Sequence, residues 1–299
     1  MLIRHASWIG KKNAASTVVP VFRKCFSCGP IRSASLQVTC DGVYEARLNG
    51  GRVGSFILAP GWTEYRKRLQ VQTYDVTDML RADNTLEITV ANGWYRRTNA
   101  PWTGTSNPDE FLPPMLIAAL RLTREDGGDE VILTDDSWQV SESTVTLSGI
   151  FLGEDVDMTR EPAFEPAVVC DFPKTALIPQ EGPEVHEQET VFPRRSFRTP
   201  KGEWVIDFGQ NLTGYMAFDL DAKTGERLSL STAEVLDRDG NFYTANYRSA
   251  RSQLHYVCRE GPSPTNRASP SSGSATCGWT RRRPPLRRRT SAPSCCTRR

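Results

Sequence analysis

The stretch at residues 43–80 alternates polar and apolar side chains and is interrupted by turn-forming pairs. Residues 43–48 alternate in one short run that ends at Asn49-Gly50. A strand-like piece follows at 52–58, up to a Pro-Gly pair, and a third piece, rich in β-formers, follows at 69–76. A period of two that is bounded by Asn-Gly and Pro-Gly is typical of antiparallel hairpins. This stretch therefore predicts antiparallel β-sheet.

The same pattern continues on both sides of that stretch. The apolar segment 115–122 (MLIAALRL) would allow a helix by composition, but Pro113-Pro114 before it and Asp126-Gly127 after it keep it short, which favours a buried strand. Residues 31–160 contain no amphipathic helix of three or more turns. Short strands with frequent turn signals predict an antiparallel sandwich. The other strands expected in this region are 35–39, 85–91, 130–133 and 138–140.

Proline density and composition divide the chain into five parts. We expect an irregular lead segment at 1–30, a jelly-roll-like antiparallel β-sandwich at 31–160, a Pro-rich linker at 161–195, an incomplete second β-sandwich at 196–260 and a disordered Arg-rich tail at 261–299. The second β-rich part is thin for a complete sandwich. The tail has no Val, Ile, Phe or Tyr, so it offers too little apolar surface to offset chain entropy. The fold class predicted for the chain is all-β.

The net charge of +2 comes from the tail, which carries nine Arg and no acidic residue. Without it, 28 basic and 35 acidic residues leave the body at −7. This excludes a basic nucleic-acid-binding body. No apolar run approaches the ~20 residues of a membrane span, and the N-terminus lacks the apolar core of a signal peptide. We therefore expect no nucleic-acid partner, no membrane insertion and a cytoplasmic location, whereas the sequence does not predict an oligomeric state.

Two patterns could suggest a metal. Cys25 and Cys28 form a C-x-x-C, but no second ligand pair stands at a zinc-like spacing, and the β and loop surroundings do not favour a redox motif. A linear acidic run is usually a set of solvated turns, because calcium needs six to eight convergent oxygens. We expect reduced thiols, no metal and no cofactor. The acidic residues that leave calcium open as an alternative are Asp135, Asp136, Glu154, Asp155 and Asp157.

The loop at 92–107 is the best candidate binding surface. Sugars stack their apolar faces on Trp or Tyr rings, while amides and guanidinium groups bind the hydroxyls. Trp94, Tyr95 and Trp102 offer rings, and the polar candidates are Asn92, Arg96 and Asn99. The alternative is that Trp94 and Tyr95 cap the sandwich core above an Asn-Gly turn.

Other residues are better explained by packing than by chemistry. Trp62 and Tyr65 follow a Pro-Gly pair and are expected to pack over a sheet end. Asp207 and Glu234 stand in strand-like contexts that imply no pocket, so we expect no catalytic pair there.

Four groups of motifs, in this order, resemble the N-terminal part of the bacterial α-L-rhamnosidases, a glycoside hydrolase family. The resemblance covers roughly residues 8–260 and depends on the order and spacing of the motifs. They are Gly42-Val43-Tyr44-Glu45, Leu48-Asn49-Gly50, Arg52-Val53-Gly54, Leu58-Ala59-Pro60-Gly61-Trp62-Thr63 and Gln72-Thr73-Tyr74-Asp75-Val76-Thr77; Asn92-Gly93-Trp94-Tyr95; Asp207-Phe208-Gly209-Gln210-Asn211 with Gly214; and Ala233-Glu234-Val235-Leu236-Asp237, Asp239-Gly240 and Arg248-Ser249-Ala250.

The resemblance implies an N-terminal β-sandwich followed by the start of a second, concanavalin-like one. It also implies that catalysis, the removal of terminal rhamnose from glycosides, belongs to a later (α/α)₆ barrel whose acidic motif we do not find here. We therefore expect an accessory part that is inactive without that barrel. The alternatives are a stand-alone carbohydrate-binding sandwich without enzymatic activity and a purely structural fragment.

A shifted reading of the tail gives a strand. Back-translated codons for 264–279, read one frame over, encode Tyr-Gln-Pro-Arg-Phe-Thr-Phe-Phe-Gly-Phe-Arg-Tyr-Val-Arg-Val, with the third bases chosen to fit. This alternating aromatic segment resembles the one that the family places at this point. The hypothesis is a frameshift near 261–264, which would make the Arg runs at 281–283 and 287–289 an accident of the codons and not a nucleic-acid patch.

Overall fold

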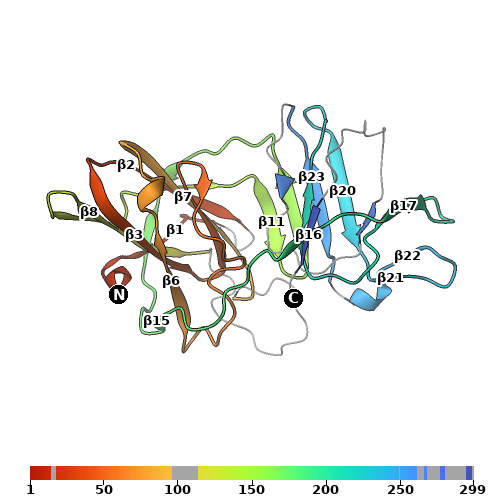
Figure 1. Cartoon of the computed structure of the whole chain (residues 1–299), viewed down its shortest axis with the longest axis horizontal. Helices are drawn as coiled ribbons and strands as arrows, with labels where there is room; N and C mark the ends of the chain where they lie inside the picture. The colour runs from red at the N-terminus through yellow and green to blue at the C-terminus, as the bar shows by residue number, and fades with distance from the viewer. Residues whose placement is uncertain are drawn as a thin grey trace. The chain divides into compact units, whose positions relative to one another are not determined.

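A computed structural model describes residues 1–14, 18–95, 114–248 and 250–260, with the backbone of three short strands between 266 and 297. Almost all regular structure in these residues is β (Figure 1), which confirms the predicted fold class. Among them, no helix is long and apolar enough to cross a membrane. The helical turns are η1 (Leu2–His5), η2 (Thr77–Met79) and η4 (Ala245–Tyr247).

The chain divides into two compact units. The first unit comprises Met1–Arg97, Ser106–Ser143 and Pro162–Val185, and the second comprises Thr98–Thr105, Thr144–Glu161 and His186–Arg299.

The first unit is a sandwich of two sheets. One sheet has the spatial order β14 (Val168–Cys170), β1 (Trp8–Gly10), β8 (Leu116–Arg124), β3 (Ile31–Cys40), β6 (Leu69–Asp75) and β15 (Leu177–Pro179), with β9 (Asp129–Leu133) also paired to β8. The other has the order β13 (Glu165–Pro166), β10 (Gln139–Glu142), β2 (Pro20–Ser27), β7 (Asp83–Ala91), β4 (Val43–Leu48) and β5 (Gly51–Arg52). All pairings are antiparallel except β15 with β6.

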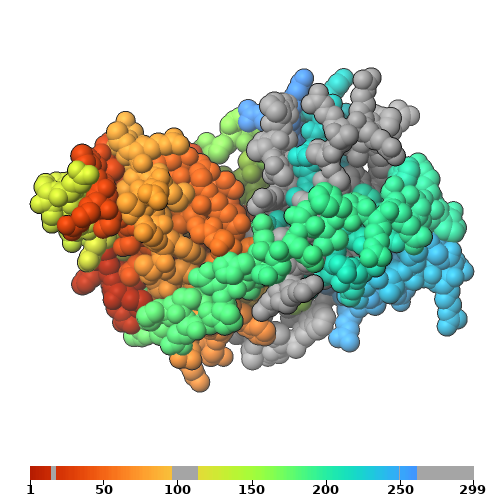
Figure 2. Space-filling view, viewed as in Figure 1, coloured from red at the N-terminus to blue at the C-terminus, as the bar shows by residue number. Residues whose placement is uncertain are grey.

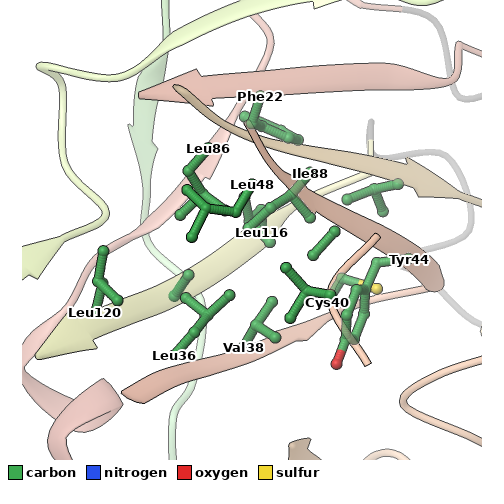
Figure 3. Close-up of a cluster of buried hydrophobic side chains, with 14 of the residues drawn as sticks. Phe22, Leu36, Val38, Cys40, Tyr44, Leu48, Leu86, Ile88, Leu116 and Leu120 are labelled. Atoms are coloured by element: carbon green, nitrogen blue, oxygen red, sulfur yellow. The ribbon is translucent and has the colours of Figure 1, made fainter. Parts of the chain in front are cut away.

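Alternating side chains from both sheets meet in one core (Figure 3). Leu36 and Val38 of β3 face Leu86 and Ile88 of β7, and all four are at most 1% exposed. Burying each such side chain contributes about 1.5–3 kcal/mol, so this layer dominates the stability of the unit.

Strand β8 confirms the expectation of a buried strand at 115–122. Its even-numbered residues from Leu116 to Leu122 enter the core between the sheets, whereas Ile117 and Ala119 point to the opposite face. A second cluster covers that opposite face with Ile3 and Trp8. Burial on both faces explains why this strand reads as a continuous apolar run.

The structure corrects three local expectations in the first unit. The lead segment is not irregular, because it supplies η1, β1 and β2, whose apolar side chains close the two clusters. The supposed linker supplies β13, β14 and β15 to the same unit. The piece at 52–58 is a strand only at its start, since Gly54 and Leu58 adopt positive φ angles that end the extended backbone.

Two buried glutamines of β6 hold the segment at 176–185 against the sheet. The Gln70 side chain accepts a hydrogen bond from the Glu181 N–H (3.0 Å), and its amide donates to the Pro60 carbonyl (3.1 Å). The Gln72 amide donates to the Gln180 side chain (2.6 Å) and its oxygen accepts from the Tyr44 hydroxyl (2.8 Å). Side-chain amides therefore continue the attachment to β6 beyond Pro179, where the short β15–β6 pairing ends.

The second unit is built around one larger sheet and has a thinner core. The larger sheet has the order β11 (Val145–Gly149), β12 (Gly153–Asp157), β23 (Gln253–Val257), β20 (Arg227–Thr232), β25 (Cys277–Trp279), β18 (Trp204–Asp207) and β17 (Arg195–Arg198). The smaller sheets are β16 (Glu189–Val191), β26 (Ser294–Thr297), β19 (Met216–Phe218) and β24 (Asn266–Arg267), and the hairpin of β21 (Val235–Leu236) and β22 (Phe242–Tyr243).

The boundary expected at residue 160 is corrected as well. Residues 144–161 belong to the second unit, because β12 pairs in parallel with β23, which lies about a hundred residues later. Gly153 opens β12 with φ +90°, and a Cβ there would lie 1.9 Å from the Gln253 carbonyl oxygen. This close approach of two backbones requires glycine.

Within 261–299, the described backbone is limited to β24, β25 and β26, each paired with strands of the second unit. The remaining residues of this tail lie outside the described residues, so the expectation of disorder stays a prediction for them.

We predict that Gln72→Ala destabilises the first unit by about 1–3 kcal/mol, because it leaves the buried Tyr44 hydroxyl and the Gln180 side chain with one partner fewer. Urea unfolding of the full chain measures this difference. Thr73→Ala, on the exposed side of the same strand, is the matched control and should stay within about 0.5 kcal/mol. Equal effects of the two substitutions would contradict the role of Gln72.

The position of β25 also bears on the frameshift hypothesis. This strand lies between β20 and β18, and the shifted reading places the β-formers Val-Arg-Val at positions 277–279 instead of Cys-Gly-Trp. A chain carrying the shifted reading over 265–279 should unfold at higher denaturant concentration than the natural chain. The control is a chain that carries the shifted residues of 265–279 in scrambled order. Equal unfolding midpoints for the shifted and the scrambled chains would count against the hypothesis.

Candidate functional site

Two aromatic pairs connect the loop before β6 with the turn after β7 in the first unit. The Trp62 and Trp94 rings are stacked, with centroids 6.4 Å apart and planes at 14°, and Trp62 is 72% exposed. Tyr65 and Tyr95 meet edge to face at 5.0 Å. An exposed, flat aromatic pair is the kind of surface on which an apolar sugar face can stack.

The chain reaches Trp94 through a tight turn after β7. Gly93 has φ +56°, and a Cβ there would lie 2.6 Å from Cγ1 of Val43, so glycine allows the turn to lie against β4. The turn is thus fixed by backbone packing, and it brings Trp94 to the ring of Trp62.

Burial separates the proposed binding residues into two groups. Trp94 is half-buried and reaches the surface pair, whereas Asn92 is 0% exposed and Tyr95 is 5% exposed. The expectation that Asn92 and Tyr95 offer groups at the surface is therefore corrected, since both lie beneath it. Arg96 and Trp102, like Asn99, lie outside the described residues.

The buried Asn92 amide has no hydrogen-bond partner among the described residues, at either its oxygen or its nitrogen. Leaving such a group unpaired costs about 1–3 kcal/mol. Asn92 follows directly on β7 and precedes the turn to Trp94, so this cost falls on the segment that positions the aromatic pair.

The sequence predicts that Trp62 packs over a sheet end, but the structure leaves it 72% exposed. The Pro-Gly pair before it signals a turn, yet no sequence pattern shows on which side of a turn a Trp will lie. Tyr65 behaves as expected: its ring is partly buried, and its hydroxyl donates to the Gly61 carbonyl at 3.3 Å.

The acidic residues weighed as a catalytic pair have other roles. One carboxylate oxygen of Asp207 accepts from the Arg195 side chain (2.9 Å), and the other accepts from the Gly209 N–H (2.7 Å). The Arg195 guanidinium, followed by the Gly209 N–H, lowers the pKa of Asp207. Glu234 is exposed. A carboxylate held in this way terminates a strand and is poorly suited to general acid catalysis.

Three of the acidic residues considered for calcium are also held by hydrogen bonds or an ion pair within the protein. Asp135 accepts hydrogen bonds from Ser137, and Asp157 accepts from the hydroxyl of Thr159, which lowers the pKa of Asp157. Asp155 pairs with Arg251 at 2.7 Å. Among the described residues, no three His, Cys, Asp or Glu side chains converge closely enough to hold a metal ion.

Cys25 lies on β2, whereas Cys28 follows directly after the last residue of that strand, Ser27. The Cys25 thiol is exposed and lies 3.8 Å from the Thr85 hydroxyl, whereas Cys28 packs against the core and its sulfur accepts from the Asn84 amide at 3.4 Å. All five described cysteines are free thiols. The two sulfurs that the C-x-x-C brings together in sequence therefore have different surroundings and different hydrogen-bond partners.

Two all-β units, one of which carries an exposed pair of Trp rings, define a β-sandwich protein. The chain belongs to the bacterial α-L-rhamnosidase family. The family model of the alpha-L-rhamnosidase N-terminal domain matches residues 29–189, and that of the bacterial alpha-L-rhamnosidase concanavalin-like domain matches 197–282.

Individual relatives agree with this assignment. The chain is 36% identical over 245 residues to an α-L-rhamnosidase of Streptomyces avermitilis and 33% identical over 277 residues to one of Alteromonas sp.. It covers 77% and 84% of its own length in these matches, but only 23% and 30% of theirs. The chain thus spans less than a third of these curated relatives.

Solved structures give the same result. The α-L-rhamnosidase of Aspergillus terreus matches 99% of this chain with a TM-score of 0.88 and 27% identity, over 36% of its own length. The Streptomyces avermitilis enzyme, solved with L-rhamnose, matches 94% with a TM-score of 0.81 and 28% identity, over 28% of its length. The resemblance read from the motifs is confirmed. The second family model extends beyond residue 260 and includes the positions of β25.

Proposed function

We propose that this chain serves as the accessory N-terminal part of an α-L-rhamnosidase that acts on glycosides with terminal rhamnose. The observation that carries the proposal is the match of two family models, one after the other, along most of the chain. The named activity of the relatives and the L-rhamnose in the Streptomyces avermitilis structure support the substrate class. The cytoplasmic location expected from the sequence stays a prediction.

Asp207 and Glu234, the two acidic residues considered as a pair from the sequence, are poorly suited to the hydrolysis of a glycoside. Glycosidases use two carboxyl groups that flank the bond, about 5–9.5 Å apart, one of them as acid. The carboxylate of Asp207 is held ionised by the Arg195 guanidinium and the Gly209 N–H, which lower its pKa. We infer that the acid–base pair belongs to the part of the relatives that this chain does not match.

The purified chain should release no nitrophenol from p-nitrophenyl α-L-rhamnoside above a buffer blank, because the proposal places the acid–base pair in the part of the relatives that this chain does not match. The Streptomyces avermitilis enzyme, assayed in the same buffer, is the positive control. Turnover that rises in proportion to the concentration of the chain would contradict the proposal.

A second function, carbohydrate binding without catalysis, is favoured by the Trp62–Trp94 pair. Its parallel rings and the exposure of Trp62 suit stacking on one sugar face. Of the residues named from the sequence, Trp94 contributes a ring, while Asn92 and Tyr95 support the turn from below. Arg96 and Trp102 remain candidates for hydroxyl binding and a further ring.

We predict that L-rhamnose changes the Trp fluorescence of the chain and that Trp62→Ala weakens binding up to about tenfold, which corresponds to the 0.5–1.5 kcal/mol of an aromatic contact. The midpoint of thermal unfolding should barely change, since Trp62 is mostly exposed. Trp204→Phe, a half-buried Trp of the second unit beside Arg198, is the matched control. Unchanged affinity of the Trp62 variant would count against this surface.

A further inference from the structure

Two arginines lie beside the end of β18 in the second unit, where the motif Asp207–Asn211 begins. Arg195 is the first residue of β17, which is the outermost strand of the larger sheet, and Arg194 precedes it. Both arginines are exposed, as are Gln210 and Asn211 in the turn after β18. Figure 1 shows β17 at the edge of this unit, and Figure 2 shows the same stretch of chain, in green to teal, at the surface. A dissolved ligand can therefore reach these groups.

The backbone and the carboxylate of Asp207 hold both arginines in place. The carboxylate accepts from the Arg195 side chain at 2.9 Å and from the Gly209 N–H at 2.7 Å, and the carbonyl accepts from the Arg194 N–H at 2.9 Å. Gly209 has φ +79°, and a Cβ there would lie 2.3 Å from Cδ of Arg194, so the Arg194 side chain lies directly against the glycine. The Arg195 guanidinium lies over the ring of Phe197, 4.9 Å from its centre. Guanidinium groups held in this way lose less entropy when they bind a ligand.

One carboxylate faces two guanidinium groups in this corner of the unit. Asp207 forms an ion pair with Arg195, whereas the Arg194 guanidinium has no hydrogen-bond or ion-pair partner in the part of the chain that the structure describes. The Arg195 side chain, the Gly209 N–H and then the charge of Arg194 lower the pKa of Asp207, so both guanidinium groups act on the same carboxylate. Residues 190–202 include four basic residues and no acidic one, although residues 1–260 carry a net charge of −7. A second anion, supplied by a ligand, would balance the second guanidinium.

The surroundings of the two arginines indicate the kind of anion. The planar guanidinium fork matches a carboxylate, to which it can donate two parallel hydrogen bonds. Val191 packs against the cluster around Phe208. The next residue, Phe192, is 56% exposed and stands two residues before Arg194. An exposed ring can stack on the apolar face of a sugar, and a uronic acid combines such a face with a carboxylate.

We propose that Arg194 and Arg195 bind the carboxylate of a uronic acid in a saccharide, and that the ring of this sugar contacts Phe192. The site gives the chain a grip on acidic glycans that is separate from the Trp62–Trp94 pair. The saccharide nature of the ligand rests on the proposed function, whereas the anion site rests on the charges and hydrogen bonds around Asp207.

Calorimetric titration of the full chain with trigalacturonate tests the proposal. The methyl ester of the same trisaccharide is the matched ligand, because it keeps the sugar rings and loses the charges. We expect the acid to bind at least about tenfold more tightly than the ester at low ionic strength, as charge-assisted hydrogen bonds to arginine require. The difference should shrink as salt is added, because exposed charges are screened. Equal affinities for the acid and the ester, or no binding of the acid, would overturn the proposal.

Arg194→Gln should weaken the binding of trigalacturonate about tenfold and leave the unfolding midpoint unchanged, because the guanidinium has no partner in the described part of the chain. Arg194→Lys, which keeps the charge and loses the fork, should fall between the two. Arg121→Gln is the matched control, since Arg121 is an exposed arginine on β8 of the first unit. Equal losses of affinity in the Arg194→Gln and Arg121→Gln variants would reveal a general charge effect and contradict a site at Arg194.

Two further measurements separate a saccharide from other anions. Phe192→Ala should weaken the binding of trigalacturonate up to about tenfold, and an unchanged affinity counts against the sugar contact. Equal affinity for trigalacturonate and for a single-stranded oligonucleotide with three phosphates would overturn the saccharide as ligand. A chain that binds trigalacturonate as expected but cleaves p-nitrophenyl α-L-rhamnoside by itself would refute the proposed function and leave this site supported.

Discussion

The burial of strand β8 on both of its faces is the constraint on which the first unit depends. Leu116 and Leu120 fill the space between the two sheets, while Ile117 contacts the cluster on the outer side. An antiparallel sheet usually leaves one face to water. Here the outer face has to be covered, and the chain uses its N-terminal residues and the segment at 170–177 for that purpose. Parts that look like a leader and a linker in sequence are therefore structural.

Polar side chains make this cover possible. A Pro-rich segment cannot donate a full ladder of backbone hydrogen bonds, so Gln70 and Gln72 satisfy the backbone and side chains at 180–182. The Gln72 side chain also accepts a hydrogen bond from the Tyr44 hydroxyl, and the Gln70 side chain donates one to the Pro60 carbonyl. Burial of Tyr44 raises the pKa of its hydroxyl well above the ordinary value, which keeps it a neutral donor to Gln72 at any pH of interest. One small network thus holds the cover to the core.

The second unit buries its apolar side chains less completely than the first unit does. Its clusters contain fewer buried side chains, among them Phe218, Leu230 and Tyr256, and part of its apolar surface stays exposed on the β21–β22 hairpin. Its larger sheet pairs β12, which precedes residues 162–185 of the first unit in sequence, with β23, which follows them.

The sequence by itself determined the all-β class, most strand positions, the buried strand at 116–124 and the family, because alternation, turn residues and motif order are local properties of the chain. Tertiary structure alone decided that 144–161 joins the second unit, that Asn92 is buried and that Trp62 is exposed. Pairing between distant strands and the side of a turn on which a ring lies depend on which remote segments pack there. Local patterns do not encode that choice, so the sequence pointed only to a loop as the candidate surface, whereas the stacking of Trp62 on Trp94 was visible only in the tertiary structure.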